Sequence, residues 1–162
     1  MNAAHLHLIL VHIPIVLVPT AILLLVIALW RKQPIIANTA LSLCIVASIV
    51  CVPAFLLGEG AEELVKDQPG VVENTIEEHE ESADLSLWLT VALGSVALFS
   101  LATKRPLPAL QPVTLKTLVV LGAVASASLS YTAFEGGKIR HPEAYGGDSL
   151  SGEHNDHEHH AD

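Results

Sequence analysis

The chain has 162 residues, of which 51% are hydrophobic and 15% are charged, and its formal net charge is −9. A soluble domain of this length carries more charge and fewer unbroken apolar runs, so the composition excludes an ordinary soluble domain. The acidic balance also excludes nucleic acid as a partner, because the phosphate backbone attracts basic surfaces.

Four apolar stretches predict membrane-spanning helices at about residues 6–30, 35–57, 85–103 and 113–134. About 20 helical residues cross the hydrocarbon core of a bilayer, and a helix satisfies its own backbone hydrogen bonds there. We therefore predict an all-α fold, an integral membrane four-helix bundle in residues 1–142. The outer connection, 58–84, adds a short helical hairpin, and residues 143–162 form a disordered tail.

The first stretch contains Pro14 and Pro19, and two interpretations fit it. Either a kinked helix spans the membrane from Leu6, or residues 3–12 form an interfacial segment and the span starts at Pro14. His12 lies inside the membrane in the first case and at its surface in the second. No basic region precedes this apolar run, so we expect the helix to be retained and not cleaved as a signal peptide.

The second stretch contains both cysteines, Cys44 and Cys51. Seven helical residues separate them by about 10 Å along the axis, too far for a mutual disulfide. Ala40, Cys44 and Ser48 form a ridge of small residues at a spacing of four, which permits close helix approach in lipid.

The 58–84 connection contains two short helical patterns, divided by a turn at 68–70. In the second pattern, Val72, Ile76, His79 and Ala83 share one helical face, while the acidic residues lie on the other faces. This helix is expected to continue into the third span. His79 should point inward, because it lies on the apolar stripe.

Threading the chain through four spans places the N-terminus, the 58–84 connection and the 135–162 segment on one face of the membrane. All nine histidines and all seventeen acidic residues lie on this face. The basic residues that flank the two short loops of the opposite face are Arg31, Lys32, Lys104, Arg105 and Lys116. The positive-inside rule then predicts a bacterial inner (plasma) membrane protein with both termini on the periplasmic side.

The histidines are the candidate ligands, because neutral imidazole binds zinc, copper, nickel and haem iron. His12 and His79 are the leading cofactor ligands, followed by His7 and His141. Further candidate metal ligands are His5, Glu59, Glu135 and, in the His- and acid-rich tail, His154, His157, His159 and His160. The sequence has no C-x-x-C-H motif for covalent haem, which leaves b-type haem or a transition metal ion.

A structural interpretation competes with this one. Each histidine can be an interfacial residue bonded to the backbone or to lipid, and the tail can be simply solvated. Glu59 and Glu135 follow outward-running helices, whose carboxyl ends carry partial negative charge, so a nearby cation should neutralise them. That cation can be Lys138, Arg140 or a metal ion.

Two short motifs resemble a family of predicted bacterial four-helix membrane proteins of unknown function. His7–Ile15 reads H-L-I-L-V-H-I-P-I and is similar to the family's H-P-x-x-V-H-F-P-I, with Leu8 in place of proline and Ile13 in place of the aromatic residue. His7 and His12 match the two histidines of that motif. Gly136–His141 resembles the glycine-pair motif after the family's last helix. Some relatives are fused to cytochrome c domains, which implies cytochrome or other respiratory partners.

Three functional hypotheses follow for this membrane protein. The first is a respiratory or electron-transfer accessory protein with a His-lined cofactor or metal site near the outer face. The second is a metal-handling or pH-sensing module of the periplasmic side, and the third is a non-catalytic structural subunit. An enzyme is disfavoured, because the sequence has no recognisable arrangement of nucleophile and base.

Overall fold

The computed structural model describes residues 2–66, 71–103 and 112–141. They form five helices: α1 (Ala3–Arg31), α2 (Pro34–Leu56), α3 (Gly58–Glu62), α4 (Glu73–Ala102) and α5 (Pro112–Arg140). No strand occurs among these residues, which confirms the all-α prediction. All but α3 are long and apolar enough to cross a membrane.

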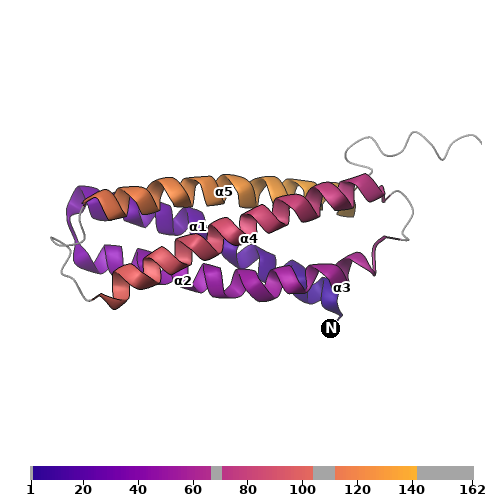
Figure 1. The fold of residues 1–162 in the computed structure, drawn as a ribbon, viewed down its shortest axis with the longest axis horizontal. Helices are drawn as coiled ribbons and strands as arrows, with labels where there is room; N and C mark the ends of the chain where they lie inside the picture. Colours follow the sequence, from indigo (N-terminus) through magenta and orange to yellow (C-terminus); the bar gives the residue numbers. More distant parts are fainter. Residues whose placement is uncertain (1, 67–70, 104–111, 142–162) are drawn as a thin grey trace, which may run out of the picture.

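The four long helices form a bundle in which each packs against two others. The order around the bundle is α1, α2, α4 and α5, with α5 returning to α1. Figure 1 shows that the start of α1, α3, the start of α4 and the end of α5 lie at the same end of the bundle. We call this the histidine-bearing end. Among the described residues, this arrangement agrees with the up-and-down order of the four predicted spans.

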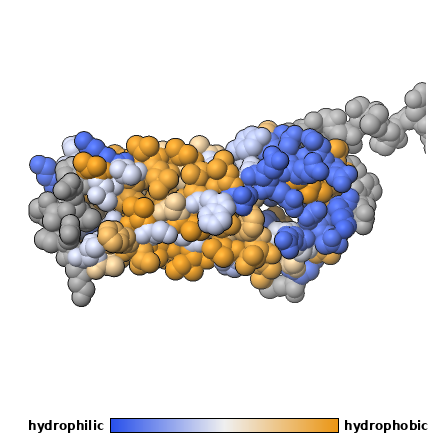
Figure 2. Space-filling model, in the orientation of Figure 1, coloured by the Kyte–Doolittle hydropathy of each residue, from blue (hydrophilic) through white to orange (hydrophobic). Residues whose placement is uncertain are grey.

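Many small side chains lie in the interior beside a few buried leucines, and large apolar side chains cover the outside. The fully buried residues include Ala21, Ala28, Ala37, Ala40, Ala47, Ala97 and Ala125. Leu23 is 60% exposed and Phe99 is 72% exposed. Figure 2 shows, on one face, a hydrophobic band along the middle of the bundle and hydrophilic residues gathered at the histidine-bearing end. Such a band suits a lipid environment, where apolar surface carries no penalty.

Helix α1 is continuous from Ala3 to Arg31 and includes both prolines. The side chain of Asn2 caps its first turn by accepting a hydrogen bond of 3.0 Å from the backbone N–H of His5. Lys32, with φ 51°, ends the helix in the left-handed conformation. Residues 3–12 therefore belong to the same helix as Pro14, whereas the position of His12 relative to the membrane stays a prediction.

Helix α4 joins the second half of the outer connection to the third span without a break, as predicted. Helix α5 runs on to Arg140, beyond the predicted end at residue 134. Gly136 and Gly137 each cost about 1 kcal/mol relative to alanine inside a helix. Close packing of α5 against α4 at Gly136 offsets this cost.

The two cysteines are free, as their spacing predicts, and both are buried. The turn at 68–70 and the tail at 143–162, with its four histidines, lie outside the described residues.

Candidate functional site

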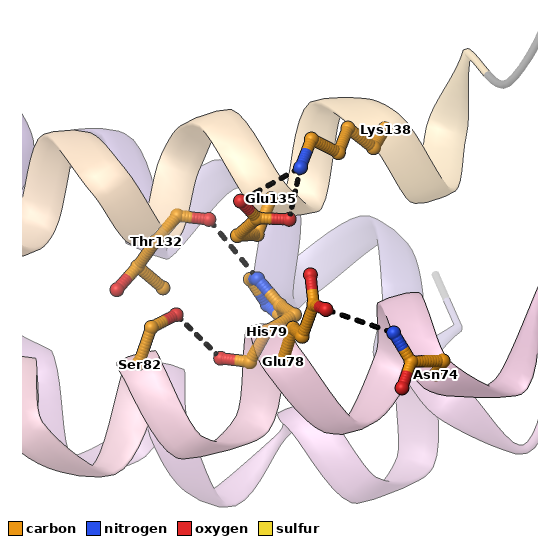
Figure 3. Close-up of polar contacts among 7 residues, drawn as sticks. All are labelled: Asn74, Glu78, His79, Ser82, Thr132, Glu135 and Lys138. Carbon is orange, nitrogen blue, oxygen red and sulfur yellow. Dashed lines mark hydrogen bonds and ion pairs between the residues drawn. The ribbon is translucent and has the colours of Figure 1, made fainter. Parts of the chain in front are cut away.

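Three helices bring titratable side chains together at the histidine-bearing end. His7 comes from α1, His79 from α4 and Glu135 from α5. The His79 ring lies against α5 at Gly136, the residue after Glu135, and His7 lies at the same end of the bundle on α1. Figure 3 shows the His79 ring reaching from α4 toward α5, where Glu135 and Lys138 lie on neighbouring turns.

Each of the two imidazoles is anchored through the same ring atom to the backbone of a neighbouring helix. His7 Nδ1 lies 2.8 Å from the carbonyl oxygen of Ala54 on α2. His79 Nδ1 lies 3.0 Å from the carbonyl oxygen of Thr132 on α5. A carbonyl oxygen only accepts, so Nδ1 carries the hydrogen in both rings, and a neutral ring then has its lone pair on Nε2.

A glycine makes room for the ring of His79. A Cβ atom at Gly136 would lie 3.1 Å from Cε1 of His79, tighter than ordinary contact. A Cβ atom at Gly58 would lie 3.8 Å from Cε1 of His7, an ordinary contact distance. The His79 ring therefore lies directly against the backbone of α5 at the first glycine of the pair.

Glu135 is a carboxylate with 1% of its surface exposed. Lys138, one turn later on α5, places its Nζ 2.9 Å from each of the two carboxylate oxygens. Only Oε1 has hydrogen-bond geometry with this ammonium, so Oε2 has an ionic contact but no hydrogen-bond partner among the described residues. Lys138 also lies 4.8 Å from the ring centroid of Phe134. Lys138 is thus the cation expected beside Glu135.

The remaining histidines on described residues lie elsewhere. His12 is exposed, and its Nδ1 contacts the carbonyl oxygen of Leu8 within α1. Five residues separate it from His7, which places the two side chains about 140° apart around the helix. His5 is exposed in the first turn of α1, and His141 is exposed just after α5. The structure therefore brings His7, and not His12, together with His79.

The predicted acidic ligand Glu59 is exposed on α3. Within residues 2–66, 71–103 and 112–141, no group of three or more His, Cys, Asp or Glu side chains lies close enough together to hold a metal ion. His7, His79 and Glu135 are neighbours, but they do not form an assembled coordination site. The tail residues His154, His157, His159 and His160 lie outside the described part of the chain.

Hydroxyl side chains continue the site into the bundle, and the sequence analysis missed them. The Oγ of Ser86 lies 2.7 Å from the Oγ of Ser128 and 2.9 Å from the Oγ1 of Thr132. A signal was present, because the stripe that carries His79 continues along α4 through Ser86 and Thr90 at helical spacing. Both of these residues are buried.

Comparison with known proteins identifies a family but no characterised relative. A family described as "Predicted membrane protein (DUF2231)" matches residues 3–144 of the chain. No curated protein and no solved structure matches the chain. The match includes all three residues of the candidate site.

Proposed function

Because the chain belongs to the DUF2231 family of predicted membrane proteins, we propose its function from the residues at its histidine-bearing end. It is an integral membrane protein that binds one transition metal ion between His7, His79 and Glu135. The basic residues that flank the two short loops support a periplasmic position for this end in a bacterial plasma membrane.

The observation that supports the proposal is that three side chains each offer an electron-donor atom to a metal ion. Two imidazoles donate Nδ1–H to backbone carbonyls, which leaves the lone pair of each Nε2 available to a metal ion. Metal-binding histidines use this backbone anchor to fix the tautomer and the ring orientation. The third such atom is Oε2 of the buried Glu135. Two imidazoles and one carboxylate suit zinc, and imidazole also suits copper and nickel.

The surroundings favour a small ion over b-type haem. The His79 ring lies against the backbone at Gly136, at a distance where even a methyl group is tight. A macrocycle needs an open apolar slot beside its ligand. A single ion needs only that the three side chains turn toward one another. Glu135 would then exchange the Lys138 ammonium for the metal cation.

The resemblance supports the physiological role. Relatives fused to cytochrome c domains suggest that the protein serves as an accessory to respiratory electron transfer. Copper at this site would itself carry electrons, whereas zinc would have a structural or regulatory role. The identity of the bound metal therefore decides between the two roles.

Metal titration of detergent-purified protein tests the proposal, with elemental analysis of the product. We expect about one zinc or copper ion per chain to remain after deletion of residues 151–162, because the site needs no tail ligand. His79→Gln and Glu135→Gln should each weaken this binding at least about tenfold. Lys138→Met should strengthen it, because the competing ammonium is removed.

His12→Gln is the matched control, since this exposed histidine on α1 should not contribute. Loss of all stoichiometric binding on tail deletion would contradict the proposal. So would an affinity that His79→Gln and His12→Gln lower equally.

The same three atoms favour a second candidate, a proton sensor, because a proton can take the place of the metal ion. Protein that binds no metal but changes conformation on acidification, only while His79 is present, would support this alternative. The measurement is near-ultraviolet circular dichroism across a pH series of the native chain and His79→Gln.

A further inference from the structure

A line of hydroxyl groups runs from the candidate site into the membrane-spanning part of the bundle. We call Thr132, Ser86, Ser128 and Thr90 the hydroxyl line. The line starts at the residue whose carbonyl oxygen anchors His79. Two hydrogen bonds join the first three members across α4 and α5.

Many hydroxyls of the spans bond within their own helix, and Thr132 of the line also does so, because its Oγ1 donates to the carbonyl oxygen of Ser128. Each of the following donates to the carbonyl oxygen four residues earlier in its own helix: Thr20, Thr39, Ser95, Ser100, Thr117 and Ser130. This bond satisfies a hydroxyl in lipid without any partner helix. All except Ser100 are exposed.

Thr90 does not make this bond. It is 0% exposed, and its Oγ1 has no hydrogen-bond partner among the described residues. The Cys51 thiol on α2 lies within its reach, but the two groups do not have hydrogen-bond geometry. An unsatisfied buried hydroxyl costs about 1–3 kcal/mol, and a water molecule is the usual partner that removes this cost.

Position along the helix sets the depth of Thr90. It lies eleven residues after His79, about 16 Å along α4. It also lies five residues inside the apolar stretch that begins at residue 85, or about 8 Å from the start of that stretch. Buried polar groups therefore extend from the buried Glu135 at the histidine-bearing end to Thr90 inside the apolar stretch.

We propose that the hydroxyl line is a water inlet, which brings solvent from the histidine-bearing end of the bundle to the Cys51 thiol. Hydroxyls both donate and accept, so they can hold a file of water molecules. Thr90 completes its hydrogen bonding with the last of them. The inlet does not depend on metal binding at His7, His79 and Glu135.

The two native cysteines provide the test. Cys51 lies beside the inlet, whereas Cys44 is two turns further along α2 and contacts the α4 backbone region at Gly94. Full-length Cys44→Ala and Cys51→Ala variants, each with one thiol, are placed in liposomes. A small, charged methanethiosulfonate that does not cross lipid is then added at the histidine-bearing end, and mass spectrometry measures modification. We expect Cys51 to react at least about tenfold faster than Cys44, because only a hydrated thiol ionises and reacts readily.

Thr90→Val keeps the shape of the side chain and removes its hydroxyl, so it should slow modification of Cys51 about tenfold. Ser95→Ala is the control, because this lipid-facing residue bonds only to its own helix. Ser86→Ala serves as a second variant if Thr90→Val does not fold, as judged by helical content. Equal rates for Cys51 and Cys44, or an unchanged Cys51 rate in both line variants, would overturn the proposal.

Discussion

Replacing Gly94 by alanine should destabilise the bundle by forcing α2 and α4 apart. A Cβ atom at Gly94 would lie 2.3 Å from Cβ of Ser48, against an ordinary contact distance of at least 3.4 Å, so about 1.1 Å is missing. It would also lie 3.3 Å from the backbone oxygen of Cys44. Neither obstacle is the free end of a flexible side chain, so the helices themselves must move.

Two opposing energies set the size of the effect. Overpacking of a close interface costs about 1–3 kcal/mol, and the rigid obstacles place Gly94→Ala at the upper end. Alanine regains about 1 kcal/mol of helix propensity over glycine. We therefore expect a net loss of about 2 kcal/mol in the free energy of unfolding.

Reversible unfolding in mixed detergent micelles, followed by circular dichroism, measures this loss. The variant Ser48→Gly removes the obstructing Cβ. The double variant with Gly94→Ala should therefore lose at least about 1 kcal/mol less unfolding free energy than the sum of the two single losses. Gly58→Ala is the control, because the nearest atom to its Cβ would lie 3.8 Å away, an ordinary contact distance. A Gly94→Ala protein as stable as the native chain would refute the reasoning, as would strict additivity with Ser48→Gly.

Two further predictions concern the candidate site. Gly136→Ala should leave thermal stability nearly unchanged, because the gain of about 1 kcal/mol in helix propensity offsets the weakened hydrogen bond of the displaced His79 ring. The same variant should bind zinc more weakly in a titration. An unchanged affinity would show that the ring position does not matter. Lys138→Met should lower the unfolding free energy by about 2 kcal/mol in the absence of metal, because the carboxylate of Glu135 then stays buried without its partner. The Lys138 ammonium is partly exposed, and this exposure limits the loss. Lys66→Met, which breaks an exposed ion pair at the same spacing, should change stability by less than about 0.5 kcal/mol, and equal losses would contradict the role of burial.

Much of the fold was predictable from the chain. Long apolar runs predicted the four spanning helices, and the stripe through Ile76 and His79 predicted which side of α4 faces the bundle. The end of α5 was not predictable from local pattern. The glycine pair after Glu135 is typical of a helix end, yet the helix continues because Gly136 lets α5 approach the His79 ring.

The candidate site was predictable only in part. His79 and Glu135 were expected near the outer end, and Lys138 was one of the two expected partners of the carboxylate. His12 was the leading partner of His79 in the sequence, but in the structure His12 is exposed and bonded within α1, whereas His7 is half-buried and bonded to α2. Both histidines of α1 lie in an apolar segment without a polar face, so no periodicity showed which of them points inward.

The sequence by itself determined the number of spans, the end of the bundle that collects the histidines and acids, and the family. Hydrophobic length and the distribution of charge decide these properties, and both can be read along the chain. Only the tertiary structure decided that His7, His79 and Glu135 are neighbours and that buried hydroxyls continue inward from them. The physical reason is that a helix in lipid is apolar on nearly every side, so close packing, and not hydropathy, sets its rotation about its own axis.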